Sequence, residues 1–160
     1  MRPLDIVFMG LMLAVLIPIV ATDLRERRIP NRLNLALGGL GLLHTVLRAP
    51  HILEVALSLG GAAITLVLLL GTRAVLGLID RRAVFGLGDV KFLVAASLWV
   101  GVQGSVAVML VASLVSILAA LAAAPWRGLR MREALPFAPM LAIGLLAVSL
   151  AGYAAAAPIR

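Results

Sequence analysis

The sequence contains no cysteine and has few charged residues for its length. The lack of cysteine excludes disulfide bonds, cysteine nucleophiles and thiolate metal sites. Only 13% of the 160 residues are charged, whereas soluble domains have about a quarter. The two histidines, His44 and His51, lack the spacing of metal ligands, and we expect both to be solvated at a turn outside the membrane. The sequence therefore predicts no bound metal and no cofactor.

Apolar residues make up 63% of the chain and occur in long runs. Because a helix needs about 20 apolar residues to cross a bilayer, these runs predict membrane spans. The expected spans are 4–22, 33–47, 52–72, a pair within 92–124 that separates at the glycines of 101–105, and 137–157. The fourth span reaches bilayer length only if it begins near residues 85–89. The sequence predicts an all-α polytopic membrane protein, a bundle of about six transmembrane helices that forms one domain over residues 1–160.

The net charge of +7 is distributed unevenly between the two sides of the predicted bundle. Most of the fourteen Lys and Arg residues fall in three stretches between spans, at 25–32, 73–91 and 127–132. Six spans place these three stretches on one side, which the positive-inside rule makes cytoplasmic, and both termini on the opposite side. The basic charge therefore reflects topology, and no aromatic or motif pattern supports a nucleic-acid partner. Membrane lipids are the expected surroundings.

Two aspartates, Asp23 and Asp89, are expected at matching depth at the cytoplasmic edge of the bundle. A carboxylate at a membrane boundary is costly, so its presence there suggests a function. Gly86 and Gly88 precede the second aspartate and leave room for a bound peptide close to the backbone. Two carboxyl groups that share one proton can hydrolyse a peptide bond, one as general base and one as hydrogen-bond donor. The alternative is that each aspartate only caps a helix or pairs with a neighbouring arginine.

Three segments of the chain resemble the signatures of type IV prepilin peptidases, which are membrane aspartyl proteases. In the first, Asp23 is followed six residues later by Ile-Pro-Asn, which contains Pro30 and Asn31, and then by a leucine. In the second, Gly-x-Gly-Asp ends at Asp89 and is followed by a hydrophobic residue and Lys91. The third is a Pro-Phe-x-Pro segment that contains Pro136 and Pro139. The three segments occur in the order that is typical of the family and extend over most of the chain.

The resemblance implies a peptidase of the bacterial inner membrane that removes the short basic leader of a prepilin or pseudopilin. Its substrate has a hydrophobic N-terminal helix, and the cut falls on the cytoplasmic side. By resemblance Asp23 and Asp89 are the catalytic pair, and the supporting motif residues are Gly86, Gly88, Lys91, Pro30, Asn31, Pro136 and Pro139. Pro30 either fixes the loop after the first aspartate or starts a helix. Without cysteines or a long loop, the chain is similar to the compact form of Flp/Tad pilus systems, which has no methyltransferase segment.

A membrane protein without catalytic activity is the alternative from another class, either a small transporter or an inactive scaffold of a pilus or secretion system. A transporter is expected to place polar groups near the bilayer midplane. The spans here carry mostly Ser and Thr, which commonly bond their own helix backbone. An inactive scaffold has no need for both aspartates, so their presence favours the peptidase.

Overall fold

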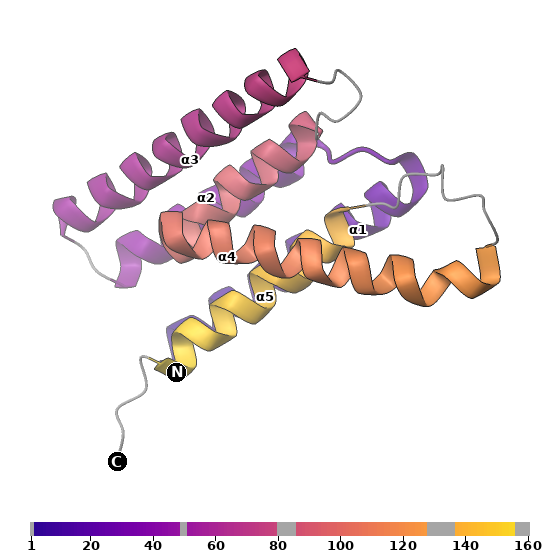
Figure 1. Ribbon diagram of the computed structural model, residues 1–160. Helices are drawn as coiled ribbons and strands as arrows, with labels where there is room; N and C mark the ends of the chain where they lie inside the picture. The colour runs from indigo at the N-terminus through magenta and orange to yellow at the C-terminus, as the bar shows by residue number, and fades with distance from the viewer. Residues whose placement is uncertain (1, 49–50, 80–85, 128–136, 156–160) are drawn as a thin grey trace.

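The computed structural model describes residues 2–48, 51–79, 86–127 and 137–155. Within these ranges it has five helices, which are α1 (Pro3–Glu26), α2 (Asn31–Arg48), α3 (Ile52–Ile79), α4 (Leu87–Arg127) and α5 (Ala138–Ala155) (Figure 1). Four of them, α1, α3, α4 and α5, are long and apolar enough to cross a membrane. The prediction of an all-α polytopic membrane protein is confirmed.

The expected number of about six helices was slightly too high, because the fourth and fifth expected spans form one element, α4. This helix is interrupted at Gly101, whose φ of 72° and ψ of −179° are not helical. The chain reverses direction there, so the two parts of α4 form a V in Figure 1. Such a backbone conformation is essentially restricted to glycine, because a side chain would be strained in it. The break therefore lies within the predicted stretch of glycines and divides α4 into two helical parts.

The hydrophobic core lies between α1, α2, α4 and α5, with Leu69 of α3 packed against it. On α1 the buried positions recur every three or four residues, which places them on one face of the helix. Asp23 continues this buried face into the last turn of α1, so its carboxylate points into the bundle. The buried residues of α1 are Asp5, Phe8, Met12, Leu16, Ile19 and Asp23.

Helix α1 ends at Glu26, three residues after Asp23. Arg27, the residue that caps its C-terminus, has a left-handed conformation with φ 52° and ψ 39°. Its backbone amide donates a hydrogen bond to the backbone carbonyl of Asp23 at 2.9 Å. This left-handed residue stops the helix, as is common at helix C-termini, and directs the chain towards α2 along the loop that carries the first motif.

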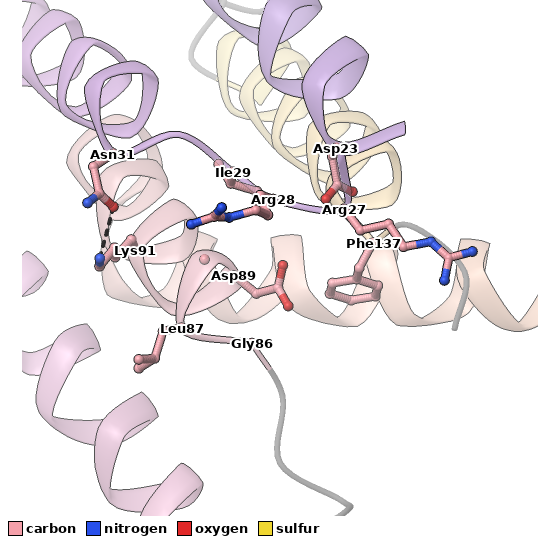
Figure 2. Close-up of a pocket in the computed structure, with 11 residues that line it drawn as sticks. Asp23, Arg27, Arg28, Ile29, Asn31, Gly86, Leu87, Asp89, Lys91 and Phe137 are labelled. Atoms are coloured by element: carbon pink, nitrogen blue, oxygen red, sulfur yellow. Dashed lines mark hydrogen bonds between the residues drawn. The ribbon is translucent and has the colours of Figure 1, made fainter. Parts of the chain in front are cut away.

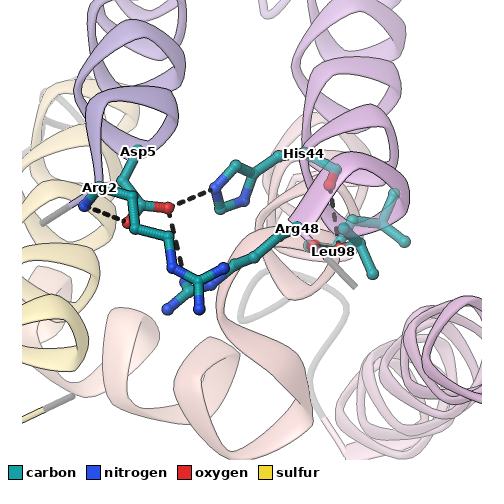
Figure 3. Close-up of polar contacts among 7 residues, drawn as sticks. Arg2, Asp5, His44, Arg48 and Leu98 are labelled. Carbon is teal, nitrogen blue, oxygen red and sulfur yellow. Dashed lines mark hydrogen bonds and ion pairs between the residues drawn. The ribbon is translucent and has the colours of Figure 1, made fainter. Parts of the chain in front are cut away.

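A second polar cluster lies at the other end of α1, around Asp5 (Figure 3). One oxygen of Asp5 accepts a hydrogen bond from the backbone amide of Arg2, and the other lies 3.0 Å from Nε2 of His44. Arg48 contributes a guanidinium nitrogen 3.8 Å from the Asp5 carboxylate. His44 is buried and stacks on Trp99, so the expectation that it is solvated was wrong, whereas His51 is exposed as expected.

The two ends of α1 thus carry one buried aspartate each. At 1.5 Å per residue, Asp5 and Asp23 are separated by about 27 Å along the helix axis. This distance is close to the roughly 30 Å thickness of a hydrocarbon core. Large apolar side chains are exposed between these levels, most extensively on α3, as expected for a surface that faces lipid. Asp23 therefore lies near one boundary of the apolar belt and Asp5 near the other.

Candidate active site

The three motif segments meet at one cavity of about 490 Å³ at the Asp23 end of the bundle (Figure 2). Both aspartates, Asp23 from α1 and Asp89 from α4, line it. The two carboxyl groups are 66 residues apart in the sequence, and the fold brings them to the same cavity. The other lining residues are Arg27, Arg28, Ile29, Asn31, Gly86, Leu87, Gly88, Lys91 and Phe137.

Asp23 is almost fully buried, with 7% of its surface exposed. Its Oδ2 accepts a hydrogen bond from the backbone amide of Ala138 at 3.0 Å. Ala138 is the first residue of α5, whose first amides have no partner inside their own helix. Asp23 thus caps α5 from a different helix. The positive end of the α5 dipole stabilises this carboxylate and offsets its unfavourable position near the C-terminus of α1.

Asp89 is the third residue of α4 and lies in its first turn. The backbone of Gly86, immediately before the helix, forms a hydrogen bond with the Asp89 carboxylate. In return the carbonyl of Gly86 accepts the amide of Val90 at 3.3 Å. Asp89 therefore also lies at a helix N-terminus, where a negative charge is favourable. It is less deeply buried than Asp23.

The two glycines of the second motif differ in how closely their neighbours approach. A Cβ atom on Gly86 would lie 3.1 Å from Oδ2 of Asp89, which is tighter than ordinary contact. A Cβ on Gly88 would lie 3.5 Å from the side chain of Ile29, which is ordinary van der Waals contact. Gly86 therefore lets the carboxylate turn back on its own helix start, whereas the contact between Ile29 and position 88 leaves room for a Cβ atom.

The first and second motifs are also linked directly by Lys91 and Asn31. Lys91 Nζ donates a hydrogen bond to Oδ1 of Asn31 at 2.9 Å. Pro30 does not line the cavity; its carbonyl accepts the amides of Leu33 and Asn34, so it stands at the start of α2. Of the two roles considered for Pro30, fixing the loop or starting a helix, its position in the structure matches the second. Asn31 and Lys91 hold the loop after Asp23 against the start of α4.

The third motif contributes to the site through residues that the sequence reasoning did not select. Pro136 lies outside the described residues, and Pro139 is the second residue of α5 without lining the cavity. The contributions come from the ring of Phe137, which lines the cavity, and from the backbone amide of Ala138. The type of a residue does not reveal whether its backbone amide donates a hydrogen bond to a site. The available signal is that a proline near a helix start marks free amides beside it.

The cavity around the two carboxyl groups is lined by basic side chains and is large enough to hold water. Arg27, Arg28 and Lys91 line the cavity together with the two acids, so their positive charges offset the repulsion between the carboxylates. Since water occupies roughly 30 Å³ per molecule in the liquid, the cavity has room for water and an extended peptide. Among the described residues, no group of three His, Cys, Asp or Glu side chains is arranged to hold a metal ion. The arrangement can activate water by acid and base catalysis at two carboxyl groups.

Comparison with protein families matches residues 10–123 to the type IV leader peptidase family. The match includes both aspartates and covers well over half of the chain. Comparison with curated proteins and with solved structures gave no match. The matched family and the four long apolar helices together identify a multi-pass membrane protease. The chain belongs to the type IV leader peptidase family.

Proposed function

We propose that this chain is an aspartyl endopeptidase that removes the short basic leader from type IV prepilins or pseudopilins of the Flp/Tad kind. The reaction takes place at the cytoplasmic face of a bacterial inner membrane, and both termini of the enzyme lie on the opposite side. The observation that carries this proposal is the shared cavity of Asp23 and Asp89. All three motif segments contribute residues to that cavity, and the chain belongs to a leader peptidase family.

In the proposed mechanism Asp23 and Asp89 share one proton and hold a water molecule between them. The ionised carboxylate takes a proton from water while the water oxygen bonds to the scissile carbonyl carbon. The protonated carboxyl donates a hydrogen bond to the carbonyl oxygen as that oxygen becomes negative. The tetrahedral intermediate then collapses, the carbon–nitrogen bond breaks, and the leaving amine takes up a proton from the pair.

The geometry of the site supports this mechanism because both carboxylates are held in place before substrate arrives. The Ala138 amide fixes Asp23, and the Gly86 backbone fixes Asp89. Hydrogen bonds that hold a catalytic group in its reactive position reduce the reorganisation needed during the reaction. The side chains of Asp23 and Asp89 lie on two sides of the same cavity in Figure 2.

The location of the site supports a membrane-anchored substrate. Asp23 lies in the last turn of α1 and Asp89 in the first turn of α4, so both are at an end of an apolar helix and not at its centre. A peptide bond just outside the hydrophobic helix of a prepilin lies at the same level of the membrane. The leader then extends into water while the helix stays among the lipids.

The test is co-expression of the chain with a Flp-type prepilin, with leader removal followed by gel shift and N-terminal sequencing. We expect cleavage by the wild type and by neither Asp23→Asn nor Asp89→Asn. Glu54→Gln, which changes an exposed acid on α3, is the matched control and should cleave normally. All variants are compared at equal levels in the membrane.

Two outcomes would contradict the proposal. Cleavage by both aspartate variants would exclude the aspartyl mechanism. Failure of the wild type to cleave Flp-type prepilins, in membranes where a known leader peptidase cleaves them, would favour the inactive scaffold.

A further inference from the structure

An apolar groove of about 590 Å³ begins beside the catalytic cavity and runs along the bundle between α2, α3 and α4. Asn31 and Lys91 line both the cavity and the groove, so the two spaces adjoin at this hydrogen-bonded pair. Beyond the pair the lining is almost entirely apolar, with Leu66 of α3 on one wall. The groove therefore connects the proposed site of cleavage with the apolar belt of the protein.

The groove follows one face of α2. Its lining residues on this helix, from Asn31 to Leu42, recur at intervals of three and four positions, as residues on one helix face do. They extend over about 16 Å of helix axis, or three turns. Two of them are glycines, Gly38 and Gly39; a Cβ on Gly38 would come within 3.3 Å of Leu98, whereas one on Gly39 would meet nothing within 4 Å. The face is thus closely packed on α4 at Gly38 and open at Gly39.

Asn34 is the one polar side chain of this groove whose amide has no partner among the described residues. It lies one turn after Asn31, only 6% of its surface is exposed, and neither its Nδ2 nor its Oδ1 forms a hydrogen bond. An unpaired buried amide is unfavourable, so its presence in an apolar wall needs an explanation. The Asn34 amide therefore has a donor and an acceptor that a bound peptide can satisfy once the side chain turns towards the groove.

Resting on the proposed function, we propose that this groove binds the apolar helix of the substrate that follows the scissile bond, and that Asn34 pairs with the backbone of its first turn. The first amides of any helix lack intrahelical partners, and a peptide entering the active site leaves carbonyl groups unpaired as well. An amide side chain satisfies both kinds of group. A lipid acyl chain would fill the apolar part of the groove but offers nothing to Asn34.

The open position at Gly39 gives a direct test. Leucine at this position has room in the fold and would fill the groove, so we expect Gly39→Leu to leave thermal stability unchanged. We expect it to lower kcat/KM for full-length prepilin roughly tenfold or more, mainly through KM. The matched control is Gly60→Leu on α3. A Cβ at position 60 also meets nothing within 4 Å, and Gly60 does not line the groove. The kcat/KM of this control should lie within about twofold of the wild-type value, a smaller change than the loss of one hydrogen bond causes.

Asn34→Leu separates recognition from structure. Replacing an unpaired buried amide with an apolar side chain of similar size should leave stability unchanged or raise it. If Asn34 recognises the substrate backbone, the same variant should have a higher KM. A fall in thermal stability with unchanged KM would show a structural role and would overturn the assignment of Asn34.

Photo-crosslinking identifies the occupant. Both crosslinking variants are made in the Asp89→Asn background. In one, a photoreactive residue replaces Leu35, which lines the groove and is 78% exposed. In the other, it replaces Ile117 on the distant part of α4. We expect position 35, and not position 117, to crosslink to the apolar helix of the prepilin. Adducts with lipid alone at position 35, or cleavage by Gly39→Leu at the wild-type rate, would overturn the groove proposal and leave the proposed function intact. Absence of cleavage by the wild type would instead reject the proposed function itself.

Discussion

Oδ2 of Asp23 accepts a hydrogen bond from the backbone amide of Ala138 at 3.0 Å, although 115 residues separate the two in the sequence. This bond joins the last turn of α1 to the first turn of α5. A carboxylate that we propose to be catalytic therefore also caps a helix. The two readings of this aspartate, catalysis and helix capping, do not exclude each other, and variants can separate them.

Asp23→Ala should lower both activity and stability, whereas Asp23→Asn should lower activity alone. Alanine removes the acceptor at the start of α5, and loss of a helix cap costs about 1 kcal/mol. Asparagine keeps an acceptor oxygen but cannot act as a base. Thermal unfolding in detergent, together with prepilin cleavage, measures the two effects. Asp23→Ala with the unfolding temperature of the wild type would show that the Ala138 bond does not stabilise the fold.

The pair formed by Lys91 and Asn31 should matter to activity as a unit. Lys91→Met and Asn31→Ala each remove the same 2.9 Å hydrogen bond, so each should lower kcat/KM by roughly twofold to tenfold, the range for a net hydrogen bond. The double variant should be no worse than the poorer single variant, because the interaction is already lost. Lys91→Arg keeps a donor and is the conservative control. Effects that add fully in the double variant would indicate that the two residues act separately.

The helical class and several residues of the cavity, both aspartates among them, could be predicted from the sequence, because both depend on local signals. Long apolar runs predicted the helices, and the motifs around Asp23 and Asp89 pointed to residues that do share a cavity. The cluster of glycines also predicted the break that divides α4 into two helical parts, but not the residue at which it falls. That depends on the φ angle of a single residue, Gly101.

Features that depend on distant partners could not be predicted. His44 is buried because Asp5, 39 positions away, supplies a hydrogen bond that compensates its desolvation. Ala138 enters the site through a backbone N–H, which every residue type except proline has. The unpaired amide of Asn34 is visible only once its surroundings are known.

The contrast between the two histidines gives a further prediction. His44→Ala should destabilise the protein, because it leaves the carboxylate of Asp5 with one hydrogen-bond partner fewer and removes the ring that stacks on Trp99. His51→Ala, at an exposed position beside α3, should have little effect. Thermal unfolding of both variants in the same detergent measures the difference. Equal unfolding temperatures would show that the Asp5 cluster does not contribute to stability.

Gly101 should not tolerate a side chain, for backbone reasons alone. Nothing lies within 4 Å of a Cβ built at this position, so an alanine meets no steric obstacle from neighbours. Its φ of 72° with ψ of −179° is nevertheless strained for any L-residue, at a cost of about 1 to 3 kcal/mol. Gly101→Ala should therefore lower the unfolding temperature, while Gly10→Ala, at an equally open position inside α1, should not. An unchanged unfolding temperature for Gly101→Ala would show that α4 does not need this bend.

Gly144 should be intolerant for the opposite reason, which is lack of space. A Cβ on Gly144 would lie 2.6 Å from the backbone carbonyl oxygen of Val108, so α5 would have to move away from α4. Backbone cannot give way as a flexible side chain does, and overpacking of this kind costs about 1 to 3 kcal/mol. Gly152→Ala, on the same helix with nothing within 4 Å, is the matched control and should be neutral or slightly stabilising. Because Ala138 at the start of α5 holds Asp23, Gly144→Ala should also reduce prepilin cleavage, and normal cleavage would show that the two ends of α5 are positioned independently.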